Sequence, residues 1–519
     1  MSTSISSLAS SPPFVDLEAR KPDPEAVVLA PGDFALKHQV LPLYIEGGVL
    51  VVAVPSESAL AAVDDLGVLV DLPVRAVYAD PSLIREQLEE RFIESILAGL
   101  PTDEGPYTEI DENADLANLQ QMAGETAVVQ MVNLIFSQAV RDGASDIHIE
   151  PYDRELRVRY RLDGILQDLI RPPKRLHAAL ISRLKILGEM NIAERRLPQD
   201  GRIKLQIAGR AVDVRVSIVP TIYGERAVLR ILDKTNALLG LPELGLAPDA
   251  LATFLQLIRQ PHGMILATGP TGSGKSTTLY AALQELISPG RNILTIEDPV
   301  EYQVAGIGQI QVRPNIGLTF ANGLRSIVRQ DPDILMVGEI RDGETAEIAI
   351  HAALTGHMVL STLHTNDAPS AIARLLDMGV EPYLAASSII GIVAQRLVRR
   401  NCPNCSAESV EPDSMLKPIG IERSELGSIH LRRGKGCEKC QGTGFKGRTG
   451  LYELLVVDET IRQMTSARAS AGVMKSYASN TLKMRTLLED GRRNVLEGKT
   501  TPDEVLRVCQ REELGIGNL

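Results

Sequence analysis

Tryptophan is absent from the sequence, and aromatic residues make up only 3% of its 519 residues. The hydrophobic cores are therefore expected to be aliphatic. A run of 18 or more apolar residues is also lacking, which excludes an obvious membrane-spanning helix. The best candidate, residues 383–398, is interrupted by Ser387, Ser388, Gln395 and Arg396. Any attachment to a membrane is expected to depend on a partner protein.

A secretory signal is not recognisable either, because residues 1–13 are rich in serine and lack both a basic start and an apolar segment. We therefore expect the chain to stay in the cytoplasm. Cysteine is scarce, with five residues of which four form two CxxC pairs. In a cytoplasmic protein, such pairs indicate metal binding rather than disulfide bonds.

Positive charge is in deficit, since 54 Lys and Arg face 66 Asp and Glu and give a net charge of −12. Proteins that mainly grip nucleic acid normally have a basic surface, so this balance argues against that class while leaving room for a local basic groove. The length predicts about three or four domains of ordinary size. The composition is that of a soluble globular protein.

The most informative segment is a phosphate-binding loop at residues 269–276. An apolar run before it predicts a buried strand and residues 277–287 after it predict a helix, which is the context that the motif requires. Its glycines let backbone amides surround an anion at the helix N-terminus. Lys275 is expected to reach the terminal phosphates of ATP, and the Ser276 hydroxyl to ligate Mg²⁺. The predicted nucleotide contacts are Gly269, Pro270, Thr271, Gly272, Ser273, Gly274, Lys275, Ser276 and Thr277.

Acidic residues follow two of the predicted parallel strands. Glu339 comes after the strand 334–337, where Mg²⁺ coordination and activation of the attacking water belong, and we predict it to be the general base. The usual motif has Asp at the strand end, but this slot holds Gly338, so Glu339 is expected to serve the metal through water. Glu297 and Asp298 end the neighbouring strand and are predicted to hold Mg²⁺ or to orient the water. The alternative is that these acids merely end their strands.

Two histidines flank a further strand at residues 358–362. His364 follows the strand and is predicted to contact the γ-phosphate and to sense its loss. A purely structural histidine is the alternative at this position. His357, at the start of the strand, is expected to be structural.

The two CxxC pairs have the spacing of a tetrahedral Zn²⁺ site, although the 31 residues between them exceed the usual gap. A closed structural site is expected, because no histidine or acid is spaced to complete an open one. Unliganded thiols are the alternative. The predicted zinc ligands are Cys402, Cys405, Cys437 and Cys440, and Cys509 is interpreted as a thiol in the core.

Strict alternation in residues 156–162 predicts a strand with apolar side chains on one face and Arg157, Arg159 and Arg161 on the other. A hairpin at residues 205–216 repeats the pattern. Two interpretations stay open. The arginines either form a solvated face, or some of them reach a bound nucleotide and stabilise charge on its γ-phosphate.

In their order, these segments resemble the secretion ATPase superfamily, the motors of type II secretion and type IV pilus systems. The resemblance spans residues 125–510, and Gly338 is itself a trait of the family. It is based on residues 145–151 (SDIHIEP), residues 196–202 (RLPQDGR), the phosphate-binding loop, an acidic box at 296–301, a Walker B motif ending in residues 338–342 (GEIRD), and a histidine box at 356–366.

The resemblance implies an α/β fold with a RecA-like P-loop ATPase domain and a PAS-like α+β second domain. Arg215 and Arg230 look similar to the family's arginines that reach the nucleotide, and the roles of Arg157, Arg159 and Arg161 stay undecided. The domains expected are a disordered tail (1–14), an amino-terminal α/β docking domain (15–100), a linker (101–118), the second domain (119–235), an interdomain connection (236–247), the ATPase core (248–400), the zinc module (401–448) and a C-terminal helical region (449–519).

Within the superfamily, the docking domain and the tetracysteine module are similar to the assembly ATPases and unlike the pilus retraction motors. Residues 241–245 and 436–454 look most like the type II secretion ATPases. The resemblance implies a homo-hexameric ring that uses ATP, Mg²⁺ and Zn²⁺, associates with the inner membrane through a single-span anchor and a polytopic platform protein, and drives pseudopilus assembly and export. The alternatives are a type IV pilus assembly ATPase, a nucleic-acid motor, and a nucleotide-binding scaffold without turnover.

Overall fold

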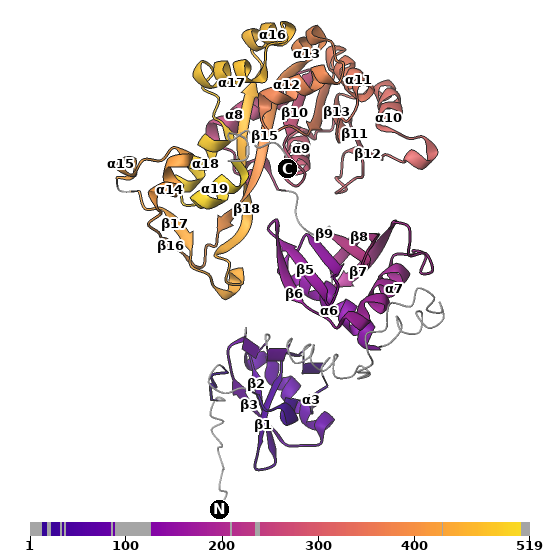
Figure 1. The fold of residues 1–519 in the computed structure, drawn as a ribbon, viewed down its shortest axis with the longest axis vertical. Helices are drawn as coiled ribbons and strands as arrows, with labels where there is room; N and C mark the ends of the chain where they lie inside the picture. The colour runs from indigo at the N-terminus through magenta and orange to yellow at the C-terminus, as the bar shows by residue number, and fades with distance from the viewer. Residues whose placement is uncertain are drawn as a thin grey trace, which may run out of the picture. The chain divides into compact units, whose positions relative to one another are not determined.

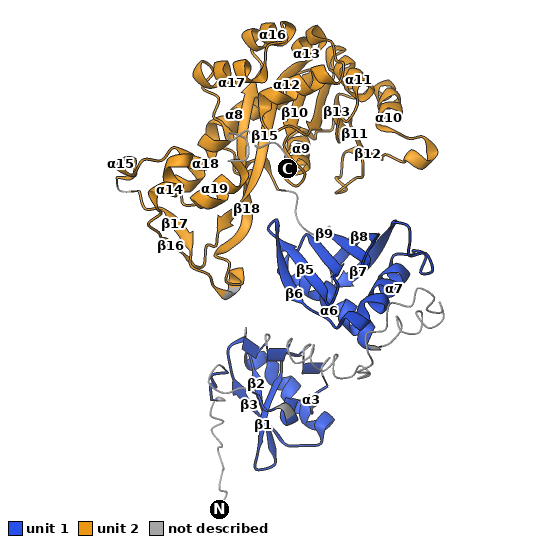
Figure 2. Cartoon of the chain, in the orientation of Figure 1, with its two compact units in different colours: residues 1–233 blue, residues 234–519 orange. Residues whose placement is uncertain are grey.

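A computed structural model describes residues 13–17, 22–27, 29–31, 34–35, 38–81, 83–84, 87–88, 126–207, 210–233, 239–427 and 429–509. The chain divides into two compact units, residues 1–233 and 234–519, which Figure 2 distinguishes by colour. Most of the expected tail 1–14 and the whole of the linker 101–118 lie outside the described residues. Each unit is treated by itself below.

The amino-terminal part of the first unit is a small three-stranded sheet in the order β1-β2-β3 (Figure 1). The strand β2 is central and almost wholly buried, which explains its unbroken apolar sequence. Gly47 and Gly48 both have positive φ, and they make the tight turn from β1 to β2. The elements are α1 (Pro24–Val27), β1 (Leu41–Glu46), β2 (Val49–Val54), η1 (Glu57–Ala59), α3 (Leu60–Val70) and β3 (Val74–Tyr78).

The second part of this unit is a six-stranded antiparallel sheet in the order β6-β5-β4-β9-β8-β7. Leu156, Val158 and Tyr160 of β5 face the core, as the alternation predicts, and the Tyr160 hydroxyl donates to the Ile135 carbonyl of α6. The elements are α6 (Thr126–Asp142), β4 (Asp146–Pro151), β5 (Leu156–Leu162), β6 (Ile165–Ile170), η2 (Lys174–Leu176), α7 (His177–Leu187), β7 (Gln199–Ile207), β8 (Arg210–Thr221) and β9 (Gly224–Asp233).

The second unit is built on a seven-stranded sheet in the order β12-β11-β13-β14-β10-β15-β18, parallel except for β18 (Figure 1). The central strand β10 sends Met264 and Leu266 into the core on one face, and Ile265 and Ala267 into the core on the other. A strand buried on both faces needs a continuous apolar run. The strands are β10 (Gly263–Thr268), β11 (Ile293–Glu297), β12 (Gly308–Gln311), β13 (Ile334–Val337), β14 (Met358–Leu363), β15 (Ile389–Asn401) and β18 (Phe445–Val456).

Helices cover both faces of this sheet. On one face pack η3 (Leu241–Leu244), α8 (Pro248–Ile258) and α9 (Lys275–Leu286). On the other face pack α10 (Phe320–Ile327), α11 (Gly343–Leu354), α12 (Ala368–Asp377), α13 (Pro382–Ser388) and the C-terminal helices α16 (Glu459–Ser466), α17 (Ala471–Asn480), α18 (Leu487–Leu496) and α19 (Pro502–Cys509). The short helices η4 (Pro314–Ile316) and η5 (Val328–Gln330) flank α10.

The strands β15 and β18 form a long antiparallel pair that reaches from the sheet to a small cysteine-containing subdomain. This subdomain comprises β16 (Ser406–Glu408), α14 (Asp413–Leu416), η6 (Lys417–Ile419), α15 (Arg423–Leu426), β17 (Arg432–Gly434) and η7 (Glu438–Cys440). The predicted α/β fold class, with a parallel nucleotide-binding sheet and a separate antiparallel sheet, is confirmed. Among the described residues, every helix is too short or too polar to cross a lipid bilayer.

Candidate nucleotide-binding site

The phosphate-binding loop joins β10 to α9 at the carboxyl edge of the parallel sheet. Gly269, Gly272 and Gly274 have φ of +146°, +79° and +89°, a region that side chains disfavour. A Cβ atom at Gly269 would lie 2.6 Å from the Ser273 Oγ, so the two ends of the loop approach each other closely. The loop therefore has the curled backbone on which anion binding depends.

Lys275 is the first residue of α9, and its side chain is buried against the loop. Its Nζ donates to the carbonyl of Gly269 at 2.8 Å and to that of Pro270 at 3.1 Å. Burial lowers the pKa of Lys275 to about 8, while the nearby Glu339 carboxylate opposes the shift. The ammonium is thus held at the loop, where it would meet the phosphates of a nucleotide.

Glu339 lies two residues beyond the end of β13 and is only 14% exposed. Its carboxylate forms an ion pair with Arg341, and its second oxygen is 3.7 Å from His364 Nε2. Burial and the Lys275 charge lower the pKa of His364, so its imidazole is neutral at pH 7. The structure brings together Lys275, Glu339 and His364 from three different strand ends.

Gly338 has a steric reason to be glycine. A Cβ atom there would lie 3.3 Å from both the Glu297 Cα and the Ile296 carbonyl oxygen. The Gly338 amide donates to that carbonyl at 2.8 Å, and its own carbonyl accepts from the Thr362 hydroxyl at 2.8 Å. Because β13 approaches β11 closely at this point, an aspartate here would require the β11 backbone to shift slightly.

The two acids at the end of β11 have different environments. Glu297 is 4% exposed, and its carboxylate accepts from three neutral donors: the Tyr280 hydroxyl, the Thr295 Oγ1 at 2.6 Å and the Gln309 Nε2 at 3.2 Å. Burial and this carboxylate raise the pKa of Tyr280. Asp298 is exposed and lines a cavity of about 300 Å³ together with Arg341, Asp342 and Glu344. The sequence does not reveal that Tyr280 and Gln309 hold Glu297.

Arg215 and Arg230 are neighbours on the antiparallel sheet of the first unit. They lie directly opposite each other on β8 and β9, and the Arg230 Nε donates to the Asp146 Oδ1 at 3.0 Å. On the same sheet Arg159 pairs with Glu150 at 2.7 Å. Arg157 pairs with Glu155 at 2.5 Å, and Arg161 lies 3.6 Å from Asp146. All five arginines lie on one sheet, and an acidic side chain lies within 4 Å of each of Arg157, Arg159, Arg161 and Arg230.

The four cysteines of the CxxC pairs converge at the far end of the β15–β18 pair. All four Sγ atoms lie within 4.8 Å of one another, and the Cys402–Cys437, Cys405–Cys440 and Cys437–Cys440 Sγ distances are 3.8, 3.8 and 3.7 Å. Tetrahedral Zn–S bonds of about 2.3 Å require sulfur atoms about 3.8 Å apart. The Cys440 Sγ also accepts the amides of Cys437 and Gly444. The arrangement fits a closed zinc site, and the 31 residues between the pairs form the small subdomain.

Comparisons with known proteins identify the families that the chain matches. The type II/IV secretion system protein family matches residues 121–507, and the MshEN domain family matches residues 11–95. The type II secretion system protein E of Dickeya dadantii is 44% identical over 498 residues, which cover 94% of this chain and 98% of that protein. The type IV pilus assembly ATPase PilB of Myxococcus xanthus is 44% identical over 501 residues, which cover 95% of this chain and 88% of that protein.

Among solved structures, the Legionella pneumophila ATPase DotB matches with a TM-score of 0.54 at 21% identity, covering 74% of this chain and 96% of that one. At this identity the match supports the fold alone. The resemblance to the type II secretion ATPases predicted from the sequence is confirmed by the curated relatives. The chain therefore belongs to the type II/IV secretion system protein family.

Proposed function

We propose that this protein is the ATPase motor of a type II secretion system. It would work as a homo-hexamer at the cytoplasmic face of the inner membrane, where ATP hydrolysis drives pseudopilus assembly and protein export. The observation that carries the proposal is the grouping of Lys275, Glu339 and His364 at the phosphate-binding loop. The long alignment with type II secretion ATPases supports the choice of machine.

Different residues of the loop would bind the phosphates of ATP and the Mg²⁺ ion. The backbone amides of the loop and Lys275 bind the phosphates, and the exposed hydroxyl of Ser276 would hold Mg²⁺. When bound, Mg²⁺ neutralises charge on the β- and γ-phosphates. Glu297 and Asp298 would hold Mg²⁺ or orient the attacking water. In this structure the buried carboxylate of Glu297 already accepts a hydrogen bond from the Tyr280 hydroxyl.

Hydrolysis needs a group that orients the attacking water and accepts its proton. We assign this role to Glu339. Its side chain is largely buried, which restricts its orientation, and it lies close to Lys275 and His364. Burial and the Lys275 charge lower the pKa of His364, and a ring nitrogen of this residue can donate a hydrogen bond to the γ-phosphate. Arg215 and Arg230 of the second domain would complete the site when that domain closes onto the ATPase domain.

The remaining parts of the chain are assigned to assembly. We assign the amino-terminal domain to recruitment by a single-span membrane protein and the ring to force on a polytopic platform protein. Zn²⁺ bound by the four cysteines would be structural. Repeated closing and opening of the second domain around the ring would move the membrane partner.

The test of the ATPase assignment is the change Glu339→Gln in the full chain. Because general-base catalysis contributes about 10²- to 10⁴-fold, we expect kcat for ATP to fall by about 100-fold or more, while ATP binding persists. Phosphate release and binding of a fluorescent ATP analogue measure the two quantities. The matched control is Glu347→Gln, which changes an exposed acid that lies 3.7 Å from His351 on α11. Hydrolysis at the native rate by Glu339→Gln would refute the assigned role.

A type IV pilus assembly ATPase is the second candidate, and the PilB match at equal identity favours it. It shares the same chemistry, so only the membrane partners distinguish the two machines. A nucleic-acid motor is the less favoured alternative, because the chain carries a net charge of −12. Stimulation of hydrolysis by DNA or RNA would bring that alternative back.

A further inference from the structure

A buried glutamine on β15 holds the phosphate-binding loop from behind. Gln395 is 1% exposed, and its Nε2 donates to the carbonyl of Ser273 at 2.6 Å. A Cβ atom at Gly274 would lie 2.8 Å from this Nε2, and one at Gly269 would lie 2.5 Å from the Gln395 backbone oxygen. The position of this strand therefore explains why glycine is needed at two points of the loop.

The direction of the Gln395 amide is fixed by a second bond. The Thr278 hydroxyl, one turn into α9, donates to the Gln395 Oε1 at 2.8 Å. With its oxygen accepting from Thr278, the side chain must present its nitrogen to the loop. The Ser273 carbonyl is thus held by a donor that has no freedom to rotate away.

This bond has a consequence for the anion side of the loop. The Ser273 carbonyl and the Gly274 amide belong to one planar trans peptide unit, so the C=O and N–H point in opposite directions. A carbonyl that points at Gln395 turns the Gly274 N–H away from β15. The glutamine thereby sets the orientation of a backbone donor in the loop that binds phosphate.

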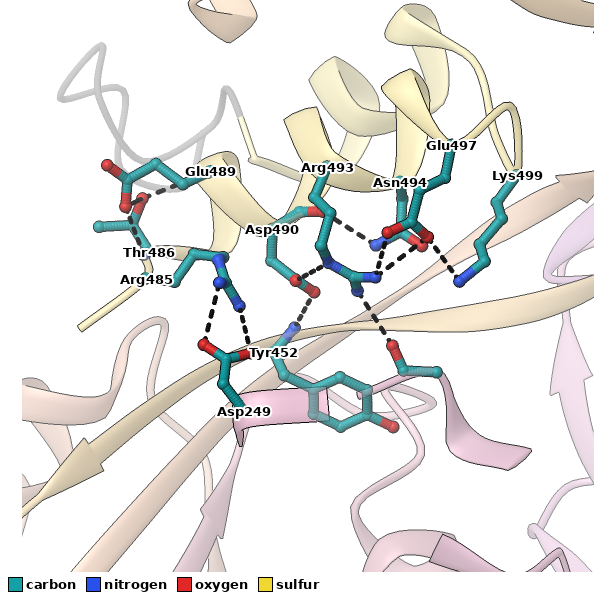
Figure 3. Close-up of polar contacts among 11 residues, drawn as sticks. Asp249, Tyr452, Arg485, Thr486, Glu489, Asp490, Arg493, Asn494, Glu497 and Lys499 are labelled. Carbon is teal, nitrogen blue, oxygen red and sulfur yellow. Dashed lines mark hydrogen bonds and ion pairs between the residues drawn. The ribbon is translucent and has the colours of Figure 1, made fainter. Parts of the chain in front are cut away.

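Tyr452 contacts both Thr278, which holds Gln395, and residue 244 in the segment before the ATPase domain. Tyr452 lies directly opposite Gln395 in the β15–β18 pair, and its hydroxyl contacts Thr278. The hydroxyl also donates to the Leu244 carbonyl at 3.3 Å. In Figure 3 the Tyr452 amide meets the carboxylate of Asp490, at 3.0 Å.

Arg493 forms a hydrogen bond with Gly245, the next residue of that segment. Its Nε donates to Asp490 at 2.8 Å and its Nη2 to the Gly245 carbonyl at 3.1 Å, contacts that can be followed in Figure 3. Gly245 has φ of +96°, and a Cβ atom there would lie 2.4 Å from the Thr449 Oγ1. The segment 244–245 is therefore held on two sides in one conformation.

We propose that Gln395 is a positioning residue for ATP. It acts through the Ser273–Gly274 peptide, and Thr278 and Tyr452 hold it in place. The inference depends on the proposed function only in that the loop binds ATP. A residue of this kind sets affinity for the nucleotide and leaves the proton transfer at Glu339 unchanged.

The sharpest test is the isosteric change Gln395→Glu in the full chain. An oxygen then faces the Ser273 carbonyl where a donor stood, while Thr278 keeps its acceptor. Because a buried carbonyl loses its partner and meets a repulsive one, we expect the KM for ATP to rise about 10-fold or more. The kcat is expected to change less than about 2-fold, because the interaction is the same in the ground and transition states.

The matched control is Asn401→Asp. Asn401 is a buried amide on the same strand, and its Nδ2 donates to the carbonyls of Arg432 and Gly498, away from the loop. This variant measures what a buried amide-to-acid change does to stability alone. Its KM for ATP is expected to stay at the wild-type value, and an equal rise in both variants would overturn the proposal.

A double-mutant cycle tests the path through Tyr452. Tyr452→Phe removes one hydroxyl, and we expect a smaller rise in KM in the same direction. Because the two residues act on one peptide, the double variant is expected to show less than the product of the single effects. Independent effects that multiply would overturn the part of the proposal that assigns Tyr452 to the same unit.

Direct binding of a fluorescent ATP analogue keeps this test separate from the proposed function. If the wild type binds ATP without hydrolysing it, the proposed function fails and the dissociation constant still tests Gln395. If Gln395→Glu does not fold, Gln395→Met removes the donor without adding charge and is measured in the same way. Gln395→Met is measured in either case, because a protonated carboxyl in Gln395→Glu can still donate to the Ser273 carbonyl, and native affinity in folded Gln395→Met would overturn the positioning role.

Discussion

Lys275 combines burial with a charge that the site requires. Its ammonium has two loop carbonyls as partners and the Glu339 carboxylate nearby, yet burial dominates and lowers the pKa to about 8. A bound phosphate adds negative charge and must raise this pKa again. Binding of ATP is therefore coupled to protonation of Lys275 at alkaline pH.

The coupling predicts the pH dependence of kcat/KM for ATP, which reports groups of the free enzyme. Only the protonated lysine attracts phosphate, so kcat/KM should be near its maximum at pH 7 and about half of that maximum near pH 8. Above the pKa of about 8 the charged fraction decreases, and kcat/KM should fall about 10-fold per pH unit. Steady-state kinetics in constant Mg²⁺ from pH 6.5 to 9.5 measure the profile.

Lys475→Gln is the control for this profile, because Lys475 pairs with Asp367 outside the loop. Its alkaline limb should follow that of the wild type. A wild-type profile that stays flat to pH 9.5 would contradict the low pKa of Lys275.

At this scale the sequence identifies Lys275 and Glu339 because each follows a recognisable strand in a fixed motif. It does not identify Gln395, which the sequence presents only as a polar residue in an apolar segment. The function of Gln395 depends on the pairing of β15 with β10 and β18, and that pairing brings together residues more than 100 positions apart. The neutral donors around Glu297 lie at most 17 positions from it, but they converge only because α9, β11 and β12 pack together.

The β15–β18 pair is the element that joins the two chemically distinctive parts of the second unit. Cys402 directly follows β15, and its amide donates to the Gly444 carbonyl just before β18. Cysteine thiolates without a metal would repel one another at distances of 3.7 to 3.8 Å. A bound Zn²⁺ removes this repulsion and closes the end of the pair.

We therefore predict one zinc ion per chain and its loss in Cys437→Ser. Because structural zinc contributes directly to folding free energy, this variant should also unfold at a lower temperature. Metal content by mass spectrometry and thermal scans measure both effects. Cys509→Ser is the matched control, since Cys509 lies in the core of the C-terminal helices and should keep its zinc.

Metal-free wild-type protein with the same melting temperature would contradict the zinc prediction. The sequence predicts the ligands well because CxxC spacing is local. It does not predict the strands and short helices between the pairs, since that segment has no clear periodicity. The parallel strands, by contrast, are evident as apolar runs because burial on both faces demands them.

Over the whole molecule, the hydrophobic residues gather into separate cores. The small amino-terminal sheet has its own aliphatic core, and so does the six-stranded sheet that follows. The ATPase sheet has a core on each face. This division is consistent with separate roles for the amino-terminal domain and the ATPase domain, which the sequence predicts from its composition and motifs.

We predict that deletion of residues 1–115 leaves the KM for ATP unchanged and abolishes capture of the single-span inner-membrane protein. The reason is that the loop and its supporting side chains all lie in the second unit. Pull-down from detergent-solubilised inner membrane, with the full chain and the deletion variant as baits, measures capture by mass spectrometry. Glu339→Gln in the full chain is the control bait, since it should still capture partners.

The captured proteins also decide between the two machines. A single-span protein of a secretion platform would support the type II assignment, and pilus assembly components would replace it with the pilus machine. Equal capture by the deletion variant would contradict the recruitment role of the amino-terminal domain. The sequence leaves this choice open because the ATPase chemistry is the same in both.

The β15–β18 pair connects the phosphate-binding loop with the cysteine site, and this connection has a consequence in the cell. The middle of the pair carries Gln395 and Tyr452 next to the phosphate-binding loop, and the cysteines lie at one end. If zinc closes that far end, zinc starvation would loosen the frame on which the loop rests. Secretion would then weaken through poorer use of ATP while the motor itself was still present in normal amounts.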